Sequence, residues 1–166
     1  MARVNTLITL TPDDSVKVLA KSNAQVGNAG AAGTTLLTSY TLPGGTMGPN
    51  DSLRISTLWQ APVLLTGTPA AVVYFGSGAT DLLSNNLVGE RSFNSMIMIH
   101  NSNSVSAQIA HPKFQSSGIS LQEEAGAGLS YSIDTTSDVV IGFQVEQVVA
   151  TEVIYLESYT IELIRG

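Results

Sequence analysis

Residues 138–148 read DVVIGFQVEQV and carry the most regular alternation in the chain. Four large apolar side chains fall on one face of an extended strand: Val139, Ile141, Phe143 and Val145. The opposite face carries Gly142, Gln144 and Glu146. Because successive side chains of a strand point to opposite faces, this spacing predicts a half-buried β-strand. We expect its apolar face to line the core between two sheets.

A second alternating stretch, residues 52–60 (SLRISTLWQ), places Leu53, Ile55 and Trp59 on one face of a strand. Further strands are expected at residues 4–10, 34–42, 70–75, 93–101, 104–110, 129–134 and 153–164. Turn-forming stretches such as residues 43–45 (PGG) separate them. About nine short strands at this spacing predict one all-β domain over residues 1–166, a sandwich or a barrel.

Residues 11–20 fit two structures. Thr11-Pro12-Asp13-Asp14 has the capping residue, proline and acid of a helix start. Val16, Val18 and Ala20 alternate like a strand, and their β-branched members favour the strand. Residues 21–33 (KSNAQVGNAGAAG) hold little to bury and are expected to form a flexible loop.

The composition restricts the possible partners. Charged residues make up 12% of the chain, about half the share in an average globular domain, and the net charge is −6. Scattered basic residues in an acidic chain argue against a nucleic-acid partner, and no polybasic or lipidation signal indicates a membrane. No stretch resembles a secretory signal, so synthesis in a cytoplasm is expected. Few charges suit a protein whose faces meet other subunits.

Candidate catalytic groups are scattered. His100 and His111 lie outside any metal-binding spacing, and the absence of cysteine excludes thiolate chemistry. The acidic pairs Asp13-Asp14 and Glu123-Glu124 are adjacent in sequence, whereas a glycosidase needs carboxylates across a cleft. We therefore expect no catalytic residue, no metal site and no cofactor.

Three other features have simpler structural explanations. Residues 76–80 (GSGAT) lack the Lys-Ser/Thr ending of a phosphate-binding loop and indicate a turn. Asp134 and Asp138 flank a short polar stretch that favours an Asx-type turn over a calcium site. Trp59 is expected in the core or at a subunit interface, rather than as an exposed sugar-binding platform.

The order of segments resembles jelly-roll virion proteins of tailed bacteriophages: head decoration or cement proteins, head fibres and tail-fibre tips. The resemblance lies in residues 37–55 (LTSYTLPGGTMGPNDSLRI), 73–80 (VYFGSGAT), 93–108 (FNSMIMIHNSNSVSAQ), 133–138 (IDTTSD) and 157–163 (ESYTIEL). The family often has a glycine where Asp51 stands here. It implies an antiparallel jelly-roll β-sandwich, commonly a homotrimer, and no catalytic residues.

Within this family we expect a capsid decoration protein that binds the major capsid protein on the outer surface of the virion. The alternatives are a tail-fibre head that recognises host glycans and, in third place, a small glycan hydrolase or cupin-like metal enzyme. Apolar residues on both faces of residues 93–101 suggest that sister subunits cover part of the surface. Ala2, Arg3, Val4 and Asn5 are the candidate contact with the shell, unless residues 4–10 form the first strand of the protein's own sheet.

Overall fold

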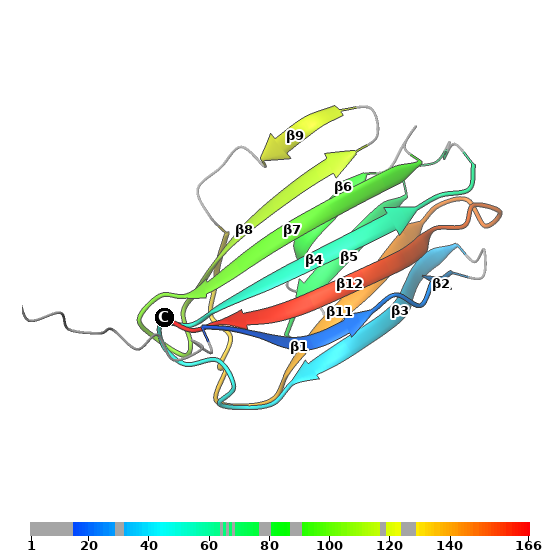
Figure 1. Ribbon diagram of the computed structural model, residues 1–166. Coiled ribbons are helices and arrows are strands. Elements are labelled where there is room, and N and C mark those ends of the chain that lie inside the picture. The colour runs from blue at the N-terminus through cyan, green and yellow to red at the C-terminus, as the bar shows by residue number, and fades with distance from the viewer. Residues whose placement is uncertain are drawn as a thin grey trace, which may run out of the picture.

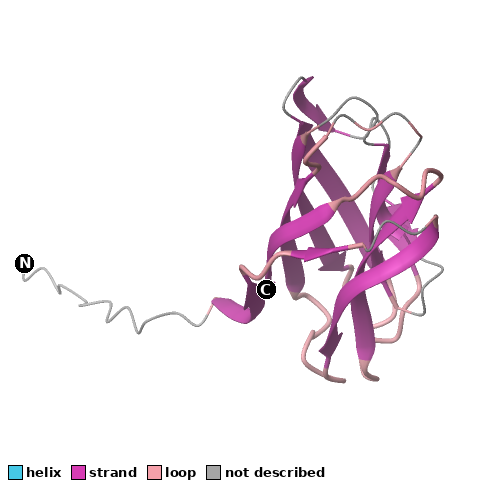
Figure 2. Ribbon diagram, turned by 90° about the vertical axis from the view of Figure 1, so that its right-hand side faces the viewer, coloured by secondary structure: helices cyan, strands magenta, loops and turns pink. Residues whose placement is uncertain are grey.

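The computed structural model describes residues 15–28, 32–63, 65, 67, 69–76, 81–86, 91–116, 119–123 and 129–166. Over these residues the chain forms two antiparallel β-sheets packed face to face, as Figures 1 and 2 show from two directions. The fold is an antiparallel jelly-roll β-sandwich. The alternating strands predict a sandwich or a barrel, and the resemblance implies the jelly roll. No helix in the described part of the chain is long and apolar enough to cross a membrane.

The larger sheet contains, in spatial order, β1 (Val16–Ser22), β12 (Tyr155–Ile164), β4 (Ser52–Gln60), β7 (Ser92–Asn101), β8 (Gln108–Ser116) and β10 (Leu129–Tyr131). Two short strands extend it: β2 (Val26–Gly27) pairs with β12, and β9 (Ile119–Glu123) pairs with β8. The smaller sheet contains, in spatial order, β3 (Gly33–Leu42), β11 (Val139–Gln147), β5 (Ala70–Phe75) and β6 (Asp81–Asn86).

The core lies between the sheets. All four apolar residues on the predicted inner face of β11 are buried, with at most 3% of any of them exposed. They face the buried side chains of the larger sheet, among them Leu53, Ile55 and Ile97. Phe143 stacks on Tyr159 of β12, with ring centroids 4.7 Å apart. The strand predicted from alternation is therefore confirmed, and so is its inner face.

Most other strand predictions are confirmed to within one or two residues. Residues 16–22 form β1, so the strand interpretation of this stretch is correct. The strand predicted at 104–110 begins only at Gln108, because residues 102–107 close a turn in which the Ser102 amide donates to the Ala107 carbonyl at 2.8 Å. The strand predicted at 129–134 ends at Tyr131. Residues 4–10 lie outside the described residues.

The prediction of a loop at residues 21–33 is wrong in part. β2 lies within it, and Asn28 is only 2% exposed. The Asn28 amide side chain donates to the Gln147 side chain, and its oxygen accepts from the Ile154 amide at 2.7 Å. Gln147 in turn donates to the Glu152 carbonyl at 2.6 Å. A buried hydrogen-bond network thus holds this stretch, although its sequence offers little apolar surface to bury.

A second buried network joins three loops at the opposite end of the sandwich. The Asn101 amide donates to the Gly48 carbonyl at 2.8 Å and to Thr135 Oγ1 at 3.2 Å. The Gln108 side chain donates to Asn101 Oδ1 and accepts from the Ile133 amide, both at 2.9 Å. These bonds hold residues 43–51, 101–108 and 132–138 together. They stabilise the end of the sandwich at which β3 and β12 terminate.

Asp51 anchors the C-terminus at this same end. Its carboxylate accepts from Arg165 at 2.5 Å, from the Gly48 amide at 2.9 Å and from the Gly166 amide at 3.1 Å. Burial acts to raise the pKa of Asp51, but these donors together hold it below its usual value. A glycine at this position would supply none of these bonds.

Candidate functional site

The two histidines meet on the outer face of the larger sheet. His100 on β7 lies beside His111 on β8, with ring centroids 5.9 Å apart, and His100 Nδ1 is 2.7 Å from Ser52 Oγ on β4. Burial, and to a smaller extent the neighbouring His111, lowers the pKa of His100. Ser52 and His100 have no carboxylate partner in the contacts described, and they lie on an open sheet face rather than in a cleft. A structural role fits this geometry.

The predicted turn at residues 134–138 is present. Asp134 Oδ1 accepts from the Thr136 amide at 2.9 Å and from the Thr136 hydroxyl at 2.6 Å, and these bonds lower the pKa of Asp134. Asp138 Oδ1 accepts from the Gly44 amide at 2.8 Å. Within the described ranges no group of three or more histidine, aspartate or glutamate side chains is placed to hold a metal ion. The Asx-type turn is therefore sufficient to explain both carboxylates.

A cleft of about 380 Å³ opens beside this turn. It is lined by Gly76, Ser132, Ile133, Asp134, Asp138, Val139 and Val140. Two carboxylates and a hydroxyl therefore stand next to three aliphatic side chains. The sequence points to the two aspartates but not to the cleft. Gly76 precedes the other lining residues by more than fifty positions, and only the pairing of β5 with β11 brings it next to Val140.

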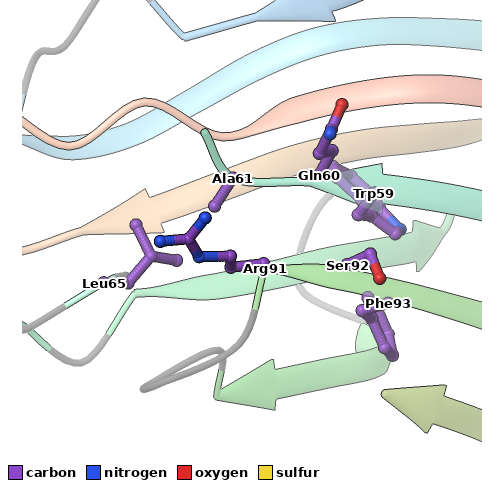
Figure 3. A pocket seen from close by; sticks show the side chains of 7 residues that line it. All are labelled: Trp59, Gln60, Ala61, Leu65, Arg91, Ser92 and Phe93. Atoms are coloured by element: carbon purple, nitrogen blue, oxygen red, sulfur yellow. The ribbon is translucent and has the colours of Figure 1, made fainter. Parts of the chain in front are cut away.

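A second pocket lies between the end of β4 and the start of β7. Figure 3 shows its lining side chains: Trp59, Gln60, Ala61, Leu65, Arg91, Ser92 and Phe93. Its volume is about 10 Å³, which is the size of one water molecule at most. Trp59 is 1% exposed, and its Nε1 donates to Thr57 Oγ1 at 2.8 Å. The prediction that Trp59 belongs to the core is confirmed, so it offers no exposed platform.

The outer face of the larger sheet exposes several apolar side chains: Val16, Val18, Leu58 and Met96, at 48%, 53%, 42% and 38%. The strand register places all four on the side facing away from the core. Arg54 and Glu162 form an ion pair of 2.6 Å in the middle of this surface, and the pairing raises the pKa of Arg54. On β7 the inner face carries Phe93, Ile97 and Ile99, and the outer face carries polar side chains and the two methionines, Met96 and Met98.

The other predicted groups cannot be placed. Ala2, Arg3, Val4 and Asn5 lie outside the described residues, as do the Asp13-Asp14 pair and Glu124. The first described residue is Ser15, whose carbonyl accepts from the Arg165 amide at 2.8 Å. Ser15 therefore lies beside the C-terminus.

No family model matches the chain, and no curated protein matches it. Among solved structures, peanut lectin with a nine-residue peptide is 11% identical, with 92% of this chain and 90% of that chain covered and a TM-score of 0.50. The seed lectin of Lotus tetragonolobus is 10% identical, with 93% and 95% covered and a TM-score of 0.48. A GH43 glycoside hydrolase is 6% identical, with 80% and 36% covered and a TM-score of 0.45. The chain thus shares the β-sandwich fold of the peanut lectin.

Proposed function

We propose that this chain is a structural subunit of a tailed-bacteriophage virion, a decoration protein that binds the outer surface of the head as a homotrimer. The observation that carries the proposal is the outer face of the larger sheet, where Val16, Val18, Leu58 and Met96 are exposed. These side chains lie on both sides of the Arg54–Glu162 ion pair on one sheet face, where they are available for contact with another protein. The small share of charged residues, 12%, suits the same role, because charges are costly to desolvate at an interface.

The resemblance of the segments to phage virion proteins supports the proposal, and the observed sandwich agrees with the fold which that resemblance implies. The candidate chemistry also agrees with it. Ser52 and His100 have no carboxylate partner among the contacts described, and the pocket between Trp59, Leu65 and Phe93 is too small for a substrate. A hollow of about 250 Å³ beside Leu58 and Trp59 contains one carboxylate, that of Glu157. We assign the protein no catalytic role.

Binding to heads that lack the protein tests this function. Purified full-length chain is expected to co-sediment with undecorated heads and to saturate at a fixed number of copies per head. A variant without Ala2, Arg3, Val4 and Asn5 is expected to bind weakly, since we place the shell contact there. Full binding after this truncation would overturn the contact, and no binding by the full chain would overturn the decoration role. Sedimentation of the free protein as a monomer at micromolar concentration would overturn the trimer.

The cleft beside Asp134 and Asp138 favours a second candidate, recognition of host glycans by a tail-fibre head. Carboxylates accept hydrogen bonds from sugar hydroxyls, while Ile133, Val139 and Val140 offer an apolar wall to the sugar ring. The fold that the chain shares with peanut lectin is compatible with this role.

A glycan array with the full chain tests the second candidate. Binding that Asp134→Asn and Asp138→Asn abolish, and that the control Asn94→Ala on the exposed outer face of β7 leaves intact, would establish it. An array without any specific signal, or a signal that both aspartate variants retain, would exclude the cleft as a glycan site.

A further inference from the structure

β3 forms one edge of the smaller sheet and is longer than the other edge strands described; β6, the opposite edge of this sheet, has six residues and begins with Asp81, and β9 has five residues and ends with Glu123. β3 runs for ten residues, Gly33–Leu42, pairs only with β11, and contains neither a charged residue nor a proline. The edge strand β1 of the larger sheet carries Lys17 and Lys21 and a break in register. β10, the strand at its other side, has only three residues. Proteins keep sheet edges from pairing with other chains by placing charged residues on them, by breaking their register or by keeping them short. β3 is long and uncharged and has one break in register.

Apolar side chains are incompletely covered along this same side of the sandwich. Leu36 is 53% exposed. Leu37 and Tyr40 of β3 pack against the core but stay partly exposed, and so do Leu19 and Ala20 of β1. Figure 1 shows β1 and β3 at the same side of the molecule, although they belong to different sheets and are not paired with each other. An additional strand at the free edge of β3 would cover part of this surface and satisfy the unpaired backbone groups.

We propose that residues 6–10 of a neighbouring subunit pair with this edge, alongside Thr38–Leu42 of β3. Residues 6–10 read TLITL, which is as free of charge as β3 and rich in strand-forming residues. The register of β3 with β11 is unbroken from Thr38 to Leu42, so this run is a regular template of matching length. We assign this segment to a second copy of the chain, and the experiment with two tagged chains below separates this from pairing within one chain.

The place where the segment leaves the sandwich agrees with this pairing. Ser15 lies beside Arg165, and Asp51, which binds Arg165, belongs to the loops at the end where β3 finishes. The Gly45 amide, three residues beyond β3, donates to the Thr135 carbonyl in the same cluster of loops at 2.8 Å. The segment therefore emerges at the end of the sandwich where Leu42 lies. Residues 11–14 (TPDD) contain a proline and two acids, which separate residues 6–10 from β1.

Each subunit gives a segment to one neighbour and receives one from another, so the contact is heterologous and closes into a ring. The inference rests on the proposed function only for the number of subunits, three. Ala2, Arg3, Val4 and Asn5 precede the pairing segment, which leaves them available to contact the shell. Pairing is tested on the purified protein and shell contact on heads, so either proposal can fail without the other.

The absence of cysteine makes the pairing directly testable. Two differently tagged chains are co-expressed, one carrying Ser39→Cys and the other a single cysteine placed at each of residues 6 to 10 in turn. Mild oxidation is expected to form a disulfide between the two chains when the cysteine stands at alternate positions of residues 6–10, because every second side chain of a strand lies on the same face as Ser39. Linkage of Ser39→Cys chains to one another would show β3 pairing with β3 instead. No linkage between the two tagged chains, which is the result that pairing within one chain would give, would also overturn the proposal.

Charge placed on the edge provides a second test. Ser39 and Thr41 are exposed on β3, and the double variant Ser39→Lys, Thr41→Lys is expected to sediment as a folded monomer at concentrations where the natural chain is a trimer. The control Ser102→Lys adds a charge to an exposed loop at the same end and should leave the trimer intact. Circular dichroism confirms that each variant is folded. A trimer that persists in the double variant would contradict strand pairing at this edge.

Discussion

Replacing Phe143 with alanine removes the aromatic side chain at the centre of the sandwich. Phe143 is fully buried, and its ring stacks on Tyr159 across the two sheets. Phe→Ala changes in protein cores cost about 3–5 kcal/mol. A stacked aromatic pair contributes about 0.5–1.5 kcal/mol beyond the buried area. We therefore expect the free energy of unfolding to fall by about 4–5 kcal/mol, near the upper end of the range.

Denaturant unfolding at fixed protein concentration measures this loss, and a thermal scan should show a decrease in Tm of roughly 10–20 °C for a domain of this size. The matched control is Gln144→Ala, the next residue of β11, whose partly buried side chain points away from the core. It should change the unfolding free energy by about 0.5 kcal/mol or less. A loss below about 1 kcal/mol for Phe143→Ala would refute the assigned face of β11 and with it the placement of the core.

Three further predictions concern individual contacts. The pKa of Asp51 in the folded protein lies below its ordinary value of 3.8, so ionised Asp51 stabilises the fold fully above pH 3.8, and this stabilisation is lost as the pH falls through the folded pKa. Unfolding measured from pH 2 to 6 should show the loss of stability. In the variant Asp51→Asn this pH-dependent loss should be absent. The pKa of His100 in the folded protein lies below its ordinary value of 6.5, so the free energy of unfolding should decrease as the pH falls from about 7 through 6.5. The variant His100→Gln should show a smaller dependence of this free energy on pH between pH 7 and 5. The same dependence in both proteins would contradict the burial of this imidazole. A Cβ at Gly44 would lie 2.3 Å from the Thr136 carbonyl oxygen, so Gly44→Ala should destabilise the fold by about 1–3 kcal/mol, whereas equal stability in denaturant would mean that residues 43–51 and 132–138 lie further apart.

The strands with strict alternation could be predicted from sequence, because one face of each is buried. β11 and β4 are examples, and the burial of Trp59 follows from its place in the β4 pattern. β6 (DLLSNN) and β9 (ISLQE) were missed, since neither has a sustained apolar alternation. They form because neighbouring strands β5 and β8 supply hydrogen-bonding partners, which is information that a single segment does not contain.

The contacts that build candidate sites depend on pairings between distant residues. Ser52 meets His100 because the register of β4 and β7 places them opposite each other. Asp51 meets Arg165, which lies 114 residues further along the chain, because β4 pairs with β12. Asn28 is buried through partners near residue 150, although its own surroundings in sequence are those of a loop. Sequence patterns could identify the individual residue types, but not these pairs.

The most direct test of the proposed function is a cryo-electron-microscopy reconstruction of phage particles that contain this protein. The proposal predicts three-subunit jelly-roll density repeated across the outer surface of the head, with the apolar face of the larger sheet or the segment before Ser15 turned toward a neighbouring protein. Copies found only at the tail would contradict the decoration role and favour the glycan-binding alternative, and particles without any such density would contradict both.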